Sequence, residues 1–486
     1  MIDTRPEAPL ASRPVSAREG VGIPHDCEVA TDVSATGTVA VGSSERRLVG
    51  VDVARGLALV GMMAVHVLPL VGPDDGMSIP WVLAAGKAAA LFAVLAGVGI
   101  AFGSGGRRRP SGRRRDAAAV SLVVRALMIG AVGLLLGYVV PADRAGVILA
   151  YYALLFVLAI PLLALSTRAL VAIAATIVVV MPVLSHLVRA ALPAAAGTNP
   201  TFTDLLTRPV ELTTELALTG TYPALPWLAY VCVGLAVGRA ALTSRGVVAR
   251  IGILGVVIAL AAGGGSWLVM NVAGGWRNLE ATALLTMSAE DYTDLVVWGP
   301  SGSTPTTSPW WLGIMAPHSS TPFDLAFTIG TSLAVLAAAV LLGRVASRVL
   351  APLAAAGSMT FTLYALHLLM VSSPVQPPSE TLAFVLQLAV VLAFALLCSR
   401  RFSRGPLEAA VWRVTRHVRR RVMEARGGSA HTGSTPSAEA PTGSTPSADA
   451  PAGSPAAPAG EAPPARPAPE WSVGLAQARA ERGATS

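Results

Sequence analysis

The first long apolar segment of the chain carries three ionisable side chains, Asp52, Arg55 and His66. Asp52 and Arg55 are three positions apart, so in a helix they are neighbours and can form an ion pair. His66 follows Arg55 by eleven positions, which places both on one helix face, roughly 16 Å apart along the axis. A neutral imidazole in a dry interior can accept a proton or an acyl group, and a guanidinium fork can hold a phosphate. A structural alternative is an interfacial Asp52–Arg55 pair with His66 hydrogen-bonded to a neighbouring helix.

A second histidine, His367, lies in a later apolar segment with the sequence GSMTFTLYALHLLM. Helical periodicity places Thr360, Tyr364 and His367 on one face of that segment. His367 is about five residues from the end of its helix, which is also the depth of His66. If the two helices are neighbours, the imidazoles of His66 and His367 converge on one pocket.

Two more candidate residues, His318 and Asp324, belong to the segment PHSSTPFD, which precedes another apolar block. His186 lies near the end of a further block, so four of the seven histidines fall near the same face of the membrane. The chain contains no HxxxH or HExxH spacing, and we therefore predict no metal site.

Lys87 is the only lysine of the chain, and it lies inside the second apolar block. It can extend to the membrane surface, or it can point into the bundle and contact an anionic group or a developing oxyanion. Arg125, in the third block, presents the same choice between the membrane surface and an incoming phosphate.

The composition of the chain sets the environment of these residues. Of 486 residues, 53% are hydrophobic and only 13% are charged, with a mean hydropathy of +0.61. Soluble proteins carry charge on about a quarter of their residues, so that class is excluded. The net charge of +8 comes from arginines beside the apolar blocks, which indicates membrane orientation and not nucleic-acid binding. The three cysteines are scattered and form no CxxC pair, so neither a disulfide framework nor a thiolate metal site is predicted.

Apolar blocks of about 20 residues recur along the chain, and a helix of that length spans a bilayer. We therefore predict an all-α polytopic membrane protein, a bundle of about ten transmembrane helices. The predicted spans are 50–71, 80–103, 117–140, 146–166, 169–188, 220–240, 248–272, 323–343, 350–372 and 381–398.

Arginines are unevenly divided between the two sets of loops that join these spans. Twelve arginines fall in one set, six of them between positions 107 and 115, and four fall in the other set. Because basic loops are retained in the cytoplasm, we predict that the arginine-rich set is cytoplasmic. Both termini are then cytoplasmic, in a multi-pass protein of the plasma membrane.

The two ends of the chain differ from its apolar middle. Residues 1–48 mix Pro, Gly, Ser, Thr and charge, and they are predicted to form a disordered cytoplasmic arm without a signal peptide. Residues 401–426 combine arginines with apolar positions at helical spacing, which predicts a basic amphipathic juxtamembrane helix. Residues 427–486 are rich in Ala, Pro and Ser and are predicted to be a disordered tail. The transmembrane domain is thus 49–400.

Several segments in order resemble a known family. RLVGVDVARGLALVGMMAVHV, followed by GKAAALFAVLAG, resembles the opening of the heparan-alpha-glucosaminide N-acetyltransferase-like membrane family, and its Asp52-x-x-Arg55-Gly56 start with His66 resembles the wider type-3 membrane acyltransferases. YPALPWLAY, PHSSTPFD and GSMTFTLYALH are similar to an actinobacterial branch with a C-terminal domain of unknown function. The resemblance covers about residues 46–400, and no position here aligns with the catalytic histidine of the lysosomal enzyme.

The resemblance implies an integral membrane acyltransferase. It would move an acyl group, acetyl in the first place, from cytoplasmic acyl-CoA (acetyl-CoA) to an amine or hydroxyl acceptor at the outer face. The implied partners are the lipid bilayer and a small-molecule or glycan acceptor, with no nucleic acid and no metal, and an oligomer is compatible with the pattern.

On this reading each candidate residue receives a role. His66 and His367 are the predicted catalytic residues, and Arg55, oriented by Asp52, is predicted to bind the donor. The residues predicted to bind the acceptor or to support the reaction are Lys87, His318, Tyr364 and Asp324.

Two other classes of function fit a polytopic helical chain. A transporter or exporter of a small metabolite is the first, although no internal repeat and no paired broken spans support it. A non-catalytic membrane protein is the second, and in that case His66 and His367 are packing residues.

Overall fold

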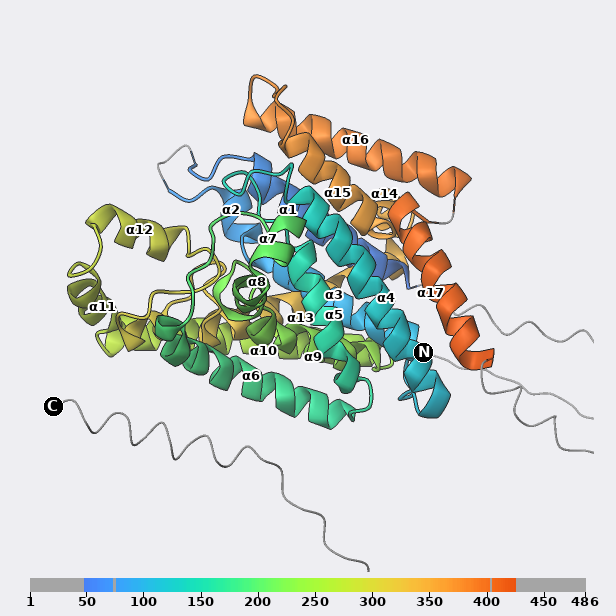
Figure 1. Ribbon diagram of the computed structural model, residues 1–486, viewed down its shortest axis with the longest axis horizontal. Helices are drawn as coiled ribbons and strands as arrows, with labels where there is room; N and C mark the ends of the chain where they lie inside the picture. The colour runs from blue at the N-terminus through green and yellow to red at the C-terminus, as the bar shows by residue number, and fades with distance from the viewer. Residues whose placement is uncertain (1–47, 73–75, 403, 425–486) are drawn as a thin grey trace, which may run out of the picture. The chain divides into compact units, whose positions relative to one another are not determined.

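The computed structural model describes residues 48–72, 76–402 and 404–424, and within these ranges the chain forms helices, turns and one isolated bridge (Figure 1). The predicted tail (427–486) and all but the last residue of the predicted arm (1–48) lie outside the described residues. The α-helices are α1 (Val49–Val67), α2 (Ile79–Ala84), α3 (Lys87–Ser104), α4 (Gly112–Leu136), α5 (Leu149–Leu162), α6 (Thr167–Val188), α7 (Phe202–Thr207), α8 (Pro209–Thr214), α9 (Ala224–Gly238), α10 (Arg245–Trp267), α11 (Gly275–Ala283), α12 (Ala289–Val297), α13 (Pro322–Val345), α14 (Ala351–Gly357), α15 (Thr360–Val371), α16 (Glu380–Arg401) and α17 (Pro406–Glu424). Short 3-10 or π turns are η1 (Arg189–Ala191), η2 (Glu215–Thr219), η3 (Leu268–Val272) and η4 (Pro309–Gly313).

The described residues do not confirm all ten predicted membrane spans. Among the described residues, seven helices are long and apolar enough to cross a membrane, or up to nine if each of two bent pairs counts as one span. One predicted span, 146–166, contains α5, whose 14 residues extend only about 21 Å, against about 30 Å for a bilayer core. The protein is nevertheless all-helical and multi-pass, as predicted.

The ninth predicted span, 350–372, is not one continuous helix. α14 and α15 are bent by 87° relative to each other at Ser358 and Met359. α14 packs so closely on α1 that a Cβ atom at Gly357 would collide with the carbonyl of Asp52. After this contact the chain changes direction, and α15 starts again at Thr360.

Small residues allow the central helices to touch. A Cβ atom added at Gly97 of α3 would lie 2.9 Å from the Cα atom of Gly234 of α9, so no larger residue fits at either position. Close backbone approach of this kind drives helix association in membranes, where water supplies no hydrophobic force. α3 is the central helix of the bundle, and most of its residues are buried.

Three arginines tie together loops at one end of the bundle, here called the arginine side. Arg239 donates hydrogen bonds to the carbonyls of Leu165 (2.6 Å) and Leu163 (3.0 Å), just after α5. Arg344 donates to the carbonyl of Leu242 (2.6 Å) after α9, and Arg419 of α17 donates to a carbonyl near the end of α3. These arginines satisfy carbonyls that helix ends leave without intrahelical partners.

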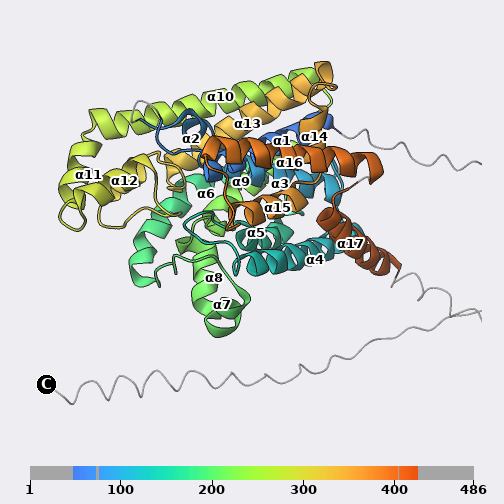
Figure 2. The ribbon, with the colours of Figure 1, turned by 90° about the horizontal axis from the view of Figure 1, so that it is seen from above.

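The connection between α10 and α13 forms a second, smaller core. It contains α11, α12 and η4, which pack around Met270, Leu279 and Trp311. α11 and α12 lie at the opposite end of the bundle from α17 in both views (Figures 1 and 2).

We predict that Arg239→Met lowers the free energy of unfolding, because Arg239 is only 7% exposed and its removal strands two buried carbonyls. The expected loss is about 1–3 kcal/mol, which thermal unfolding of the detergent-solubilised protein would measure. Arg250→Met, at an exposed arginine of α10, is the matched control and should change little. Equal effects of the two substitutions would contradict the assigned role of Arg239.

Candidate functional site

His66 and His367 are in direct contact, although 301 residues separate them in the chain. His66 Nδ1 lies 3.1 Å from His367 Nε2, and the two rings are stacked with their planes 4° apart. His367 Nδ1 in turn lies 2.9 Å from Oε1 of Gln387 on α16. His367 is fully buried and Gln387 is 5% exposed, whereas His66 is partly exposed.

The direction of the hydrogen bonds in this row follows from the amide oxygen of Gln387. Gln387 Oε1 can only accept, so His367 Nδ1 carries a proton and its Nε2 does not. His66 Nδ1 must then be the donor to His367 Nε2, and His66 Nε2 is left with a free lone pair. The arrangement thus fixes His66 in the tautomer that can accept a proton from a substrate.

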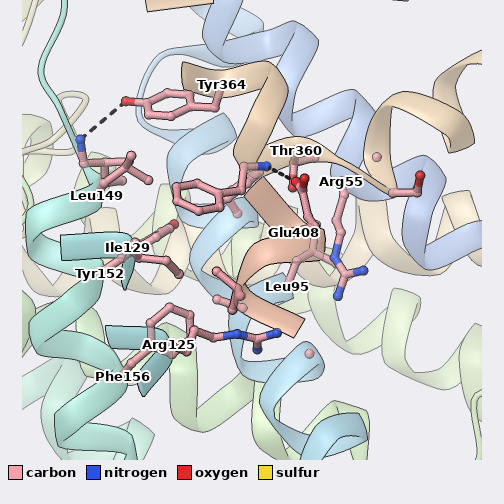
Figure 3. Close-up of a pocket in the computed structure, with 18 of the residues that line it drawn as sticks. Arg55, Leu95, Arg125, Ile129, Leu149, Tyr152, Phe156, Thr360, Tyr364 and Glu408 are labelled. Carbon is pink, nitrogen blue, oxygen red and sulfur yellow. Dashed lines mark hydrogen bonds between the residues drawn. The ribbon is translucent and has the colours of Figure 1, made fainter. Parts of the chain in front are cut away.

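Three cavities meet at or near His66. The first, the arginine cavity, has a volume of about 550 Å³ and reaches from the arginine side into the bundle (Figure 3). Its lining includes Arg55, Leu95, Arg125, Ile129, Tyr152, Phe156, Thr360, Tyr364, Arg404, Glu408 and Trp412. Cations lie toward one end and aromatic and aliphatic groups further in, which suits an elongated ligand with an anionic head.

Arg55 reaches the arginine cavity from α1 and is held by an ion pair. Its Nη1 atom lies 3.1 Å from Oδ1 of Asp52, one helical turn earlier, and Asp52 is 5% exposed. Asp52 does not line the cavity, so it orients Arg55 without approaching a ligand. Arg125 extends over the ring of Phe156, 5.8 Å from its centroid, and shares the cavity with Arg55.

Helix α17 closes one wall of the arginine cavity. Its Glu408 accepts hydrogen bonds from the amides of Phe361 (2.7 Å) and Thr362 (3.1 Å), and so caps the first turn of α15. The Thr362 hydroxyl donates to Glu408 (2.6 Å) and accepts from the Leu407 amide (3.1 Å), so the two helix starts cap each other.

Trp412 of α17 also faces the arginine cavity, and two guanidinium groups flank its ring. Arg404 lies 4.7 Å and Arg416 4.9 Å from the ring centroid. These cation–π contacts gather further positive charge at the mouth of the cavity.

A narrow second cavity, here called the histidine cleft, connects the arginine cavity to His66. It is about 20 Å³ in volume and shares Met62, Ile148 and Tyr364 with the arginine cavity. The Tyr364 hydroxyl donates to the carbonyl of Gly146 (3.2 Å) and accepts from the amide of Ile148 (3.4 Å). Because both hydrogen-bonding functions are occupied, Tyr364 holds the 146–148 turn at the junction of the cavities.

The third cavity, here called the distal cavity, opens at the end of the bundle away from the arginine side. It has a volume of about 390 Å³ and is lined by His66, Gln387, Asp143, Arg144 and Glu380, among others. His66 belongs to the lining of both this cavity and the histidine cleft. The imidazole therefore stands between two compartments on opposite sides of the protein.

His318 lines the histidine cleft opposite the His66–His367 pair. Its backbone is left-handed, with φ of +59°, and its ring contacts that of Tyr222 edge-on at 5.5 Å between centroids. Its Nδ1 atom is buried without a hydrogen-bond partner. Strained backbone and an unsatisfied polar atom are both more common at functional sites than elsewhere.

Lys87 and Asp324 lie in a fourth cavity and not in the lining of the three described above. The Lys87 ammonium donates to the carbonyl of Val82 (2.8 Å) and lies 5.8 Å from the ring centroid of Phe327. Asp324 accepts from the amide of Ser320 (3.0 Å), and its own amide donates to Thr321 Oγ1 (3.1 Å), as in a helix cap. The structure thus brings His66, His367, His318 and Tyr364 together, whereas Lys87 and Asp324 line a different cavity.

Part of the chain matches a known protein family. Residues 47–270 match the family described as heparan-alpha-glucosaminide N-acetyltransferase, catalytic. The match supports placing this part of the chain in a heparan-alpha-glucosaminide N-acetyltransferase-like family. No curated protein matches the chain. The match indicates membrane N-acetyltransferase activity and includes His66, Arg55 and Arg125, whereas His367, Gln387 and α17 lie beyond it.

Three residues of this site, Gln387, Glu408 and Trp412, were not predicted from the sequence. Gln387 is the only polar residue in the apolar run from Leu382 to Cys398, and that isolation was the available signal. Nothing in the sequence pairs Glu408 with the start of α15. Within the described residues, no group of three or more His, Cys, Asp or Glu side chains is placed to hold a metal ion.

We predict that His318 makes the stability of this protein depend on pH. Burial, followed by the nearby charge of Lys87, lowers the pKa of His318 from 6.5 to about 4. The unfolded chain therefore binds a proton near pH 6.5 that the folded chain resists until about pH 4, and stability is lost as the pH falls through that window. The melting temperature of the His318→Asn variant should therefore fall less steeply between pH 7 and pH 5 than that of the wild type. An unchanged slope, or the same change in His417→Asn at an exposed histidine, would exclude this role.

Proposed function

We propose that this protein is an integral membrane acyltransferase that moves an acetyl group from acetyl-CoA to an amine or hydroxyl acceptor. The observation that carries the proposal is the position of His66, an imidazole with a free Nε2 lone pair between a cationic cavity and an open cavity on the other side. The match of residues 47–270 to an N-acetyltransferase family supports the choice of the group transferred.

The arginine cavity is the proposed donor site. Arg55 and Arg125 would hold the phosphates of CoA, with Asp52 keeping Arg55 in position. The apolar inner lining, which includes Ile129 and Tyr152, suits the pantetheine arm (Figure 3). Tyr364 and Met62 line both the arginine cavity and the histidine cleft, so the thioester would lie beside them, at the entrance to the cleft.

The proposed reaction is a direct transfer with His66 as general base. His66 Nε2 takes a proton from the acceptor amine or hydroxyl as its nitrogen or oxygen attacks the thioester carbonyl. A carbon–nitrogen or carbon–oxygen bond forms, the carbon–sulfur bond breaks, and the thiolate of CoA leaves. The proton on His66 then passes to that thiolate, which gives free CoA and returns the imidazole to its starting state. His367 stabilises the protonated His66 intermediate, and Gln387 orients His367.

The arrangement of arginines supports a direction for the transfer. The arginine side carries the basic loop 104–116 and the basic face of α17. Both features favour an orientation in which this side faces the cytoplasm, with the protein in the plasma membrane. On this assignment both chain termini are cytoplasmic, the donor binds from the cytoplasm, and the acceptor reaches His66 through the distal cavity.

The decisive experiment is acceptor-dependent release of CoA by the purified protein. His66→Gln should reduce the rate by about 10²–10⁴-fold, because the amide cannot accept the proton, while thermal stability stays close to that of the wild type. His186→Gln is the matched control, since His186 is a buried histidine that lines none of the cavities described here. Full activity of His66→Gln would refute the mechanism, and solute uptake without CoA release would support a transporter instead.

Gln387 is a positioning residue, and its oxygen is the feature to test. Gln387→Leu removes the acceptor for His367 Nδ1–H and should lower kcat about tenfold, the equivalent of one buried hydrogen bond. Gln387→Glu keeps an acceptor oxygen and should restore most of kcat, with KM for acetyl-CoA unchanged in both. If both variants lose the same activity, Gln387 matters only for packing.

The proposed orientation can be tested with single cysteines in a background whose native cysteines are replaced by serine. S111C and S301C change exposed serines at opposite ends of the bundle. A membrane-impermeant maleimide should label S301C in intact cells, and S111C only after the membrane is opened, because arginine-rich loops resist translocation. Labelling of S111C in intact cells would reverse the orientation.

A further inference from the structure

A fourth cavity, here called the lateral cavity, is the largest space described in the protein that the proposed reaction does not use. It has a volume of about 1220 Å³ and lies among α1, α2, α10, α13 and the loop before α13. Its rim includes apolar side chains that are well exposed: Leu57 (44%), Leu83 (69%) and Trp267 (58%). In a membrane-spanning bundle such side chains face lipid, so the cavity opens to the hydrocarbon of the bilayer.

The lining of the lateral cavity is apolar apart from a few groups. Lys87 supplies the cation, at the first turn of α3 after a break at Gly86. Trp81 Nε1 and Ser332 Oγ are both buried without a hydrogen-bond partner. Asp324 also lines the cavity, but its carboxylate accepts the Ser320 amide at the start of α13. The cavity therefore offers a positive charge and unused donors to an incoming group.

We infer that the lateral cavity binds a membrane lipid whose headgroup ends in an exposed, anionic phosphate monoester. Lys87 would pair with the phosphate, the indole N–H of Trp81 would donate to one of its oxygens, and the apolar lining would enclose the acyl or prenyl chain. A glycerophospholipid with an exposed phosphate and a polyprenyl phosphate share this chemistry.

The position of the lateral cavity gives such a lipid access to the reaction centre. Ala84 and Ala88 line both the lateral cavity and the histidine cleft. A headgroup beside Lys87 is thus one layer of small side chains away from the cleft that contains His66 and His318.

The proposal can be tested by photolabelling the full chain in phosphatidylcholine nanodiscs. Three probes with a diazirine in the chain are compared: phosphatidic acid, a polyprenyl phosphate and phosphatidylcholine. We expect at least one phosphate probe to label the peptides around positions 57–64 or 263–271 more than the phosphatidylcholine probe. The probe that labels identifies the source of the lipid, and equal labelling by all three would overturn the proposal.

Two pairs of variants separate the site from nonspecific contact. G263F places a ring in the lateral cavity, where a Cβ atom at Gly263 has open space, and it should abolish the labelling. G264F is its control, since Gly264 is equally unobstructed but does not line the cavity. K87M should lower the preference for a phosphate probe about fivefold, the equivalent of about 1 kcal/mol for one basic group, and K87R should keep it.

Each result bears on the lipid site independently of the proposed acyl transfer. Unreduced labelling in G263F, or an unchanged preference in K87M, would overturn the lipid site. If G263F fails to fold, the comparison of K87M with K87R still decides. Labelling needs no acetyl-CoA, so an inactive protein that shows the expected pattern would sink the proposed reaction and leave the lipid site standing.

Discussion

The hydrogen bond between His66 and His367 is the interaction on which the rest of the site depends. It joins α1 to α15 in an interior where an unpaired imidazole nitrogen would be costly, and its 3.1 Å length requires the two helices to lie side by side. α15 lies beside α1 after the chain bends by 87° between α14 and α15. The Glu408 carboxylate accepts hydrogen bonds from the amides in the first turn of α15 and stabilises that turn. α16 then supplies Gln387, which sets the direction of both bonds.

Two wide cavities lie around this pair, with a narrow cleft between them. The arginine cavity and the distal cavity are both wide, whereas the histidine cleft between them is about 20 Å³. His66, Tyr364 and Tyr222 line this constriction, and His66 also lines the distal cavity. A water-excluding site also strengthens the electrostatic contacts made by its few polar groups.

Much of this arrangement could be predicted from the sequence. Hydropathy gave the helical segments, and the equal depth of His66 and His367 correctly suggested that the imidazoles converge. The bend at Ser358 could not be predicted, because it follows from the contact of Gly357 with α1, which no local pattern encodes. That Lys87 and Asp324 line a different cavity from the histidines could not be predicted, because the sequence does not show which side of the bundle a residue faces. The contact of Glu408 with α15 is likewise a property of tertiary packing.

The site is divided between two stretches of chain with different sequence relationships. The segment that matches the N-acetyltransferase family, 47–270, contributes His66 and the cavity arginines Arg55 and Arg125. The later helices contribute His367, Gln387 and the wall that α17 forms along the arginine cavity. Substitutions in α15–α17 alone can therefore change the hydrogen bonds of His66 and the shape of the arginine cavity. Chains that inherit an unchanged first half can in this way diverge in chemistry while still carrying the same family signature.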